Sequence, residues 1–130
     1  MIEFHLDARS GVPTYLQLVQ QVTQALRLGI LQPGDQLPTV KEVVGSLAIN
    51  PNTVLKAYRE LDLNGLVEGR RGQGTFVLSH VPPVPPNDVK VLRTSLQRWI
   101  DRGRAAGLDD ENLATLFHDT LRPPAVSRVA

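Results

Sequence analysis

A proline-rich segment at residues 79–87, SHVPPVPPN, places the tightest limit on how this chain can fold. Its four prolines lack amide donors and fix their own φ angles. The segment can therefore sustain neither a helix nor a central strand, and it is predicted to be an extended linker. Because the chain has 130 residues, one small domain fits before this segment and only a short appendage fits after it. We therefore expect no large effector-binding or catalytic domain in these 130 residues.

Composition and charge narrow the function classes. The sequence is 42% hydrophobic and 21% charged, which is typical of a folded soluble protein, and no apolar run is long enough to cross a bilayer. The absence of cysteine excludes disulfides, and the first residues lack the pattern of an export signal, so we expect a cytoplasmic protein. The net charge is only +1, and basic and acidic side chains balance over residues 1–80. A nucleic-acid partner must therefore be argued from where the charges sit.

The spacing at which apolar residues recur changes near the start of the chain. Residues 2–6 alternate between apolar and polar side chains, which predicts a short half-buried strand. From Thr14 the apolar residues recur at helical spacing as far as Ile30. This pattern predicts a helix that ends at Pro33 and Gly34.

Two strong helix starts follow close together. Residues 39–42, TVKE, have the spacing of a capping box, in which Thr39 accepts a backbone hydrogen bond and Glu42 reaches back to the cap. Asn50 followed by Pro51 is a preferred N-cap with proline at the first helical position. Only a tight connection separates the two predicted helices, which is the arrangement of a helix-turn-helix.

A glycine-rich hairpin with a basic tip completes the N-terminal part. Two short β-runs, at residues 66–68 and 75–78, flank the sequence GRRGQG. Three helices followed by such a hairpin predict a winged helix-turn-helix over residues 1–79. The whole chain is thus expected to be mainly α with a small β wing.

In this fold the helix that begins at Asn50 would lie in the major groove of DNA, with the hairpin over the backbone or the minor groove. The first turn of such a helix points short polar side chains at base edges and phosphates, and its dipole favours anions. Arginines in the hairpin offer forked donors to phosphates or to a narrow minor groove. The predicted DNA-binding residues are Thr39, Lys41, Asn50, Asn52, Thr53, Lys56, Arg59, Arg70, Arg71, Gly72, Gln73, Gly74 and Thr75.

Each of these residues also has a structural interpretation. Asn50 begins a helix whatever else it contacts, and Thr39 serves as a cap. Two charges such as Lys56 and Arg59, taken alone, are more often a solvated helix face than a DNA contact. Their joint placement beside a basic hairpin favours DNA binding. The three histidines are scattered without metal-ligand spacing, so neither a metal nor another cofactor is predicted.

Beyond the linker, expected over residues 80–87, two further helices are predicted. Together they form a helical segment at residues 88–121, in which Asp88 and Asp109 are the N-caps. Both helices carry an apolar stripe, and Trp99 is expected to be core or interface rather than a ligand platform. The tail at residues 122–130 is predicted to be disordered.

Several separated motifs resemble the GntR family of bacterial regulators. GDQLPT at residues 34–39, NPNTV at 50–54, KAY at 56–58 and RRGQGTFV at 70–77 occur in the order that the family has. The short C-terminal part is similar to the YtrA subfamily, whose members carry two helices for dimerisation in place of a full effector domain.

The resemblance implies a homodimer on an inverted-repeat DNA operator and repression of a neighbouring operon, often one that encodes a transporter. The predicted dimer interface consists of Leu92, Leu96, Trp99, Ile100, Leu113, Leu116 and Phe117. Where the family usually has arginine in the second helix, this chain has Lys41, which cannot make a planar bidentate contact with guanine. An unknown small-molecule effector would have to bind at the dimer interface or between the two parts of the chain.

Two other function classes compete with this interpretation. A winged helix can serve as a protein-interaction module, which an exposed apolar patch on the third helix would favour, and residues 51–60 show no such pattern. An enzyme is less well supported, because the sequence offers no cysteine, no nucleophile and base in a recognisable arrangement, and no phosphate-binding loop.

Overall fold

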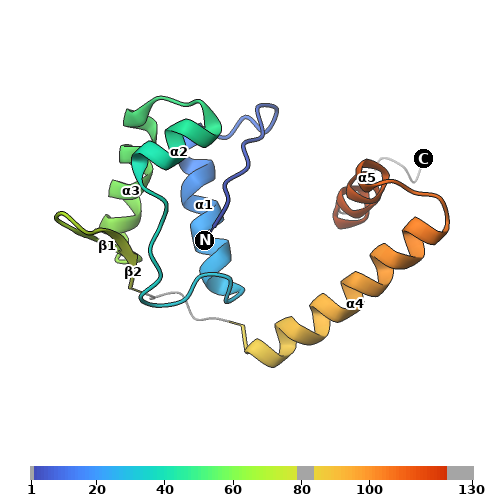
Figure 1. Ribbon diagram of the computed structural model, residues 1–130. Helices are drawn as coiled ribbons and strands as arrows, with labels where there is room; N and C mark the ends of the chain where they lie inside the picture. The colour runs from blue at the N-terminus through green and yellow to red at the C-terminus, as the bar shows by residue number, and fades with distance from the viewer. Residues whose placement is uncertain (1, 79–83, 123–130) are drawn as a thin grey trace, which may run out of the picture. The chain divides into compact units, whose positions relative to one another are not determined.

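The computed structural model describes residues 2–78 and 84–122, and the chain divides into two compact units, residues 1–86 and 87–130. Unit 1 contains helices α1, α2 and α3 and strands β1 and β2, and unit 2 is built from helices α4 and α5 (Figure 1). The predominance of helices beside one two-stranded sheet confirms the predicted fold class. Within the described ranges, every helix is too short or too polar to cross a membrane.

Helix α1 (Thr14–Arg27) is shorter than its sequence pattern predicts. It ends well before Pro33, because Gly29 adopts a left-handed φ of 75° and turns the chain back onto the last helical turn. Ile30, predicted on the buried face of the helix, is 55% exposed, and Leu31 takes a core position instead. The glycine, not the proline, ends this helix.

Residues 2–6 form no strand, so the predicted strand is wrong. The Gln21 side chain of α1 supplies the backbone hydrogen bonds that a neighbouring strand would provide. Its Oε1 accepts from the His5 amide at 2.9 Å, and its Nε2 donates to the His5 carbonyl at 2.6 Å. Phe4 is buried. The alternation therefore reflects packing against a helix rather than pairing in a sheet.

Helix α2 (Val40–Leu47) begins with the predicted capping box. Thr39 Oγ1 accepts from the Glu42 amide at 3.1 Å, and Glu42 Oε1 accepts from the Thr39 amide at 3.2 Å. At the other end, Ala48 has a left-handed φ of 54°. This residue makes the sharp turn that leads into α3.

Helix α3 (Pro51–Leu63) also begins where the sequence predicts. Asn50 Oδ1 accepts from the Asn52 amide at 2.8 Å, which satisfies one of the free donors of the first turn. After the helix, Gly65 takes a positive φ of 75°, as expected of a glycine at this place.

Strands β1 (Val67–Arg70) and β2 (Gly74–Val77) form the predicted antiparallel hairpin, with its tip at residues 71–73. The segment that leads into α2 lies beside β2. The Leu37 amide donates to the Thr75 carbonyl at 2.9 Å, and the Val77 amide donates to the Asp35 carbonyl at 2.8 Å. These bonds tie the hairpin, hereafter the wing, to the entry of α2.

The core of unit 1 lies where α1, α2, α3 and the wing meet. The largest fully buried side chains are Leu18, Val22, Leu37, Val54, Leu61, Val67 and Val77. Tyr58 is buried, and its hydroxyl donates to the Pro38 carbonyl, which joins α3 to the residue before the cap of α2. Burial, and secondarily the charge of Glu42, raises the pKa of Tyr58 well above its usual range.

Unit 2 consists of α4 (Pro86–Ala105) and α5 (Asp110–Leu121). Helix α4 begins at Pro86, so Asp88 lies in its first turn and is not the N-cap that was predicted. Proline is compatible with a first turn, where its missing amide would have no intrahelical partner. Residues 86 and 87 are therefore helical and not part of the linker. Asp109 caps α5 as predicted, since its Oδ1 accepts from the Asn112 amide at 2.8 Å. Residues 79–83, in and beside the predicted linker, and 123–130 of the predicted tail lie outside the described residues.

Candidate nucleic-acid interface

The start of α3 presents polar side chains to solvent. Asn52, Lys56 and Arg59 are exposed, whereas Val54 on the opposite side is fully buried in the core. Residues at this spacing share one face of a helix, and the half-buried Thr53 lies at its edge. Because the core fixes the rotation of α3, the four predicted contacts of this helix stay on its outer side.

The predicted residues at the starts of α2 and α3 combine two tasks. Thr39, Lys41 and Asn50 are exposed, and both Thr39 and Asn50 already use a side-chain oxygen as a cap. The amide nitrogen of Asn50 is thus the group of this side chain that an incoming ligand would meet. Lys41 lies on the first turn of α2.

The wing and the cap of α2 come together in space. Thr39 and residues 69–75 line a shallow concavity of about 560 Å³ that is open to solvent. It includes the predicted residues Gly72, Gln73, Gly74 and Thr75. Gly72 and Gly74 have φ values of 76° and 128°, which side chains rarely adopt, so the tip needs glycine at both positions.

The two arginines of the wing are held differently. Arg70 lies with its Cζ 4.4 Å from the centre of the Phe76 ring and its Nε 3.5 Å from Glu68 Oε1, so it is stacked along the hairpin. Arg71, at the tip, is exposed and takes part in neither of the ion pairs found among the described residues. Arg71 can therefore reach a phosphate without breaking an internal contact. The sequence pattern did not separate these two roles.

Two contacts at this surface were not predicted from the sequence. Gln36 Nε2 donates to the Gln73 carbonyl at 3.1 Å, and a Cβ at Gly74 would lie 2.5 Å from the same nitrogen. On the other side, Lys56 Nζ lies 4.1 Å from the centre of the Tyr15 ring. Both contacts join residues that are distant in the sequence. The only sequence signal was the position of Gln36 within GDQLPT.

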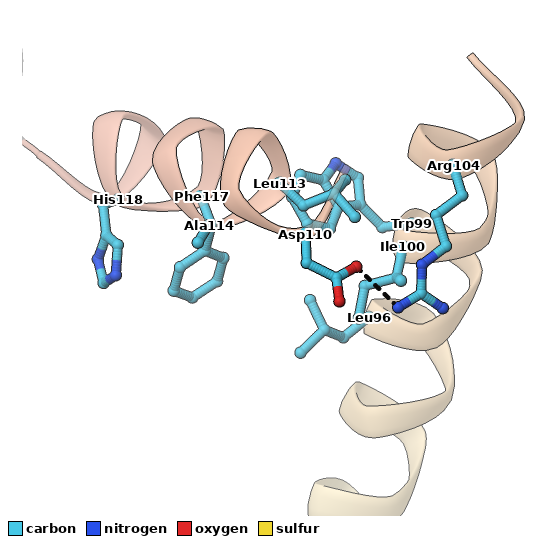
Figure 2. Close-up of a pocket in the computed structure, with 9 residues that line it drawn as sticks. All are labelled: Leu96, Trp99, Ile100, Arg104, Asp110, Leu113, Ala114, Phe117 and His118. Carbon is cyan, nitrogen blue, oxygen red and sulfur yellow. Dashed lines mark hydrogen bonds and ion pairs between the residues drawn. The ribbon is translucent and has the colours of Figure 1, made fainter. Parts of the chain in front are cut away.

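The predicted dimer residues lie in unit 2, where most of the apolar side chains are exposed. The exposed fractions are 65% for Leu92, 42% for Leu96, 43% for Leu116 and 39% for Phe117, whereas Leu113 is buried. Trp99 and Phe117 lie with their ring centres 6.4 Å apart. Figure 2 shows these rings, with Leu96, Ile100 and Leu113, around a pocket of about 410 Å³ between α4 and α5.

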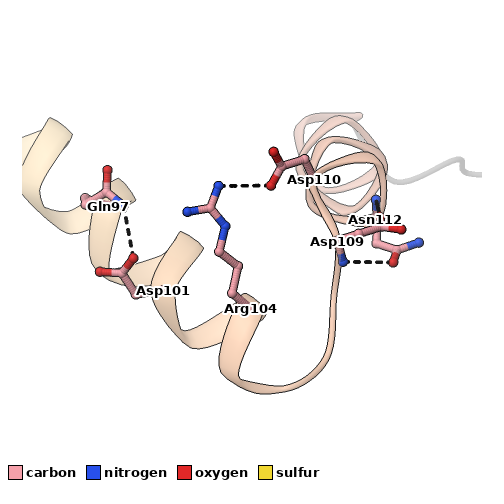
Figure 3. Close-up of polar contacts among 6 residues, drawn as sticks. All are labelled: Gln97, Asp101, Arg104, Asp109, Asp110 and Asn112. Carbon is pink, nitrogen blue, oxygen red and sulfur yellow. Dashed lines mark hydrogen bonds and ion pairs between the residues drawn. The ribbon is translucent and has the colours of Figure 1, made fainter.

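Polar contacts surround the turn between α4 and α5 (Figure 3). Arg104 Nη2 lies 2.9 Å from Asp110 Oδ1, but these side chains are 54% and 81% exposed, so the pair adds little stability. Packing contributes more, because Gly103 lies so close to Leu113 that a Cβ would collide with its side chain. The absence of a side chain at this position lets the two helices approach.

The geometry of unit 1 defines a class of protein. Two capped helices joined by a tight turn, an outward-facing second helix and a basic two-stranded hairpin constitute a winged helix-turn-helix of the kind that binds DNA.

Comparison with known proteins assigns the family. Residues 14–77 match the bacterial regulatory proteins of the gntR family. The HTH-type transcriptional repressor YtrA of Bacillus subtilis is 36% identical over 109 residues, which cover 83% of this chain and 84% of that protein. This chain therefore belongs to the GntR family of DNA-binding transcriptional regulators and is YtrA-like, as its motifs predicted.

Solved structures agree with this assignment. YtrA from Sulfolobus acidocaldarius, a GntR-family transcription factor, is similar with a TM-score of 0.55 and 30% identity, over 78% of this chain and 97% of that one. The DNA-binding domain of AraR, solved in complex with operator ORX1, is similar with a TM-score of 0.51 and 25% identity. That similarity covers 58% of this chain and 95% of the AraR domain.

Proposed function

We propose that this protein is a repressor that binds an inverted-repeat operator as a homodimer. The observations that carry the proposal are the exposed polar face of α3 and the concavity that Thr39, the N-cap of α2, shares with the basic wing. The AraR domain, of similar fold, binds operator DNA, which supports the same use of unit 1 here. YtrA of Bacillus subtilis is itself a repressor.

On DNA, the residues divide by chemistry. Asn52 and Thr53, on the first turn of α3, are suited to base edges, because amides and hydroxyls can both donate and accept hydrogen bonds. Lys56, Arg59 and Arg71 are suited to phosphates, which fix the position of the protein on the duplex. Lys41 would contact a phosphate or a base with less discrimination than arginine.

A second copy of the chain is the proposed occupant of the apolar surface of unit 2. A segment of roughly 40 residues seldom holds a stable core alone. In the described residues of unit 2, Leu113 is the one buried apolar side chain, while other large ones such as Leu92 and Phe117 are exposed. A two-fold interface between identical surfaces would cover them and would bring two α3 helices together in one assembly.

The dimer can be tested by sedimentation equilibrium of the full chain. We expect a dimer for the parent protein, a monomer for Leu96→Asp, and an unchanged dimer for the control Leu63→Asp. Leu63 suits the control because it is 78% exposed and lies in unit 1. A monomeric parent protein, or a Leu96→Asp variant that dimerises as tightly as the parent, would contradict the proposal.

The direction of regulation needs a separate assay. The operator would be the DNA sequence that the protein selects from a random pool of duplexes. A reporter gene placed behind this operator should be expressed less when the protein is produced, and its expression should recover when the Asn52→Ala variant is produced instead. Expression that rises with the protein would show an activator instead.

The protein-interaction alternative gains no support from α3. Two large apolar side chains of this helix are exposed, Leu55 at 45% and Leu63 at 78%. They stand about two turns apart and do not form the continuous patch that a protein partner would need.

A further inference from the structure

The ammonium of Lys56 rests on an aromatic ring of another helix. Lys56 Nζ, on α3, lies 4.1 Å from the centre of the Tyr15 ring, on the first turn of α1. A cation at this distance from a ring face is attracted by the electrons of the ring. The contact links the helix proposed to enter the major groove to the start of α1.

The two partners differ in mobility. Tyr15 is half-buried and packs against the core cluster of unit 1, so its ring is held in place. Lysine carries its charge on a flexible four-carbon stem and loses conformational entropy when it is fixed. The ring thus acts as a fixed support for a side chain that would otherwise sample many rotamers.

Among the residues that the structure describes, no carboxylate forms an ion pair with Lys56. Glu60 stands four residues after Lys56, at the spacing of an ion pair within a helix. Among residues 2–78 and 84–122, however, the ion pairs join Arg70 to Glu68 and Arg104 to Asp110. The charge of Lys56 is therefore oriented without being neutralised, and it remains available to an anion.

We infer that Tyr15 is a positioning residue for DNA binding, which holds the Lys56 ammonium on the outer face of α3 ready for a backbone phosphate. The inference rests on the proposed docking of α3 on DNA. A lysine that is already oriented gives up less entropy on binding. Tyr15 thereby adds to affinity through Lys56 rather than through a contact of its own.

A double-mutant cycle tests this inference with the full chain and a labelled duplex that carries the sequence it selects from a random pool. Tyr15→Leu should raise Kd about two- to fivefold, the usual strength of an exposed contact of this kind. Tyr15→Phe, which keeps the ring, should bind like the parent. In the Lys56→Met background, Tyr15→Leu should have no further effect.

Equal effects of Tyr15→Leu in both backgrounds would overturn the inference and assign Tyr15 a purely structural role. A Phe variant that binds as poorly as the Leu variant would overturn it as well, because the hydroxyl would then be the active group.

The contact can also be tested without DNA. In NMR spectra, the ε-methylene protons of Lys56 should be shifted upfield by the ring in the parent and in Tyr15→Phe, and not in Tyr15→Leu. Unshifted protons in the parent would overturn the inference. Failure of the whole chain to bind any duplex would instead count against the proposed function.

Discussion

Tyr58→Phe is the substitution whose effect the structure defines most closely. The ring is buried at 7% exposure, and phenylalanine fills nearly the same volume, so the change removes little but the hydroxyl. That hydroxyl donates to the Pro38 carbonyl, which no backbone amide among the described residues reaches. The variant leaves a buried acceptor unsatisfied, and we expect the free energy of unfolding to fall by about 1–3 kcal/mol.

The assay is urea unfolding of the full chain, followed by far-UV circular dichroism and by fluorescence of Trp99, the single tryptophan. Because Trp99 lies in unit 2, its transition should stay in place while the transition of unit 1 moves to lower urea. The control is Tyr15→Phe, a matched change at a half-buried tyrosine, which should be nearly neutral. Equal stability of Tyr58→Phe and the parent would show that the hydrogen bond from Tyr58 to Pro38 does not stabilise unit 1.

The same residue predicts a dependence on pH. The pKa of Tyr58 is raised in the folded state, so above pH 10 the unfolded chain loses this proton while the folded chain keeps it. The free energy of unfolding of the parent should then fall with rising pH, by at most about 1.4 kcal/mol per pH unit from this group. Tyr58→Phe lacks this contribution, so the difference between the two proteins should be constant from pH 7 to 9 and shrink above pH 10. A difference that grows with pH would contradict the assignment.

Three further predictions concern the wing and unit 2. Arg71→Ala should weaken binding to all duplexes and reduce the slope of log K against log salt by about 0.9, the value for one phosphate. Arg70→Ala should change this slope less. Equal slopes for the two variants would contradict the different roles of the two arginines. Gly74→Ala should weaken DNA binding in a mobility-shift assay, because φ at this position is 128° and the new Cβ would displace the Gln36 amide. Unchanged affinity would show that the wing accommodates a side chain at this position. Leu113→Ala should destabilise unit 2 by about 2–5 kcal/mol and shift the Trp99 fluorescence transition to lower urea, whereas an unmoved transition would mean that Leu113 is not a core residue.

Local chemistry made the helix starts predictable from the sequence. At Thr39, Asn50 and Asp109, the capping side chain and the amide that it satisfies are at most three residues apart, so the signal lies in one short stretch. The hairpin was equally predictable, since its glycines mark the turn. These features fixed the fold class and the position of α3.

Features that depend on distant partners were not predictable in this way. The segment at residues 2–6 looks like a strand because Phe4 is buried, but its backbone bonds go to Gln21, which no periodicity reveals. The contacts of Lys56 with Tyr15 and of Gln36 with the wing likewise arise only when the chain is packed. The sequence therefore gives the candidate site residues, and the packing decides how each side chain is held.

Operator binding by a homodimer can be tested by letting the full chain select duplexes from a randomised DNA pool near physiological salt. We expect enrichment of an inverted repeat whose half-sites lie about 10 base pairs apart, centre to centre, or a multiple of that spacing. Enrichment of no sequence by protein shown to be folded and dimeric, or of a single half-site without a repeat, would contradict operator binding by a homodimer.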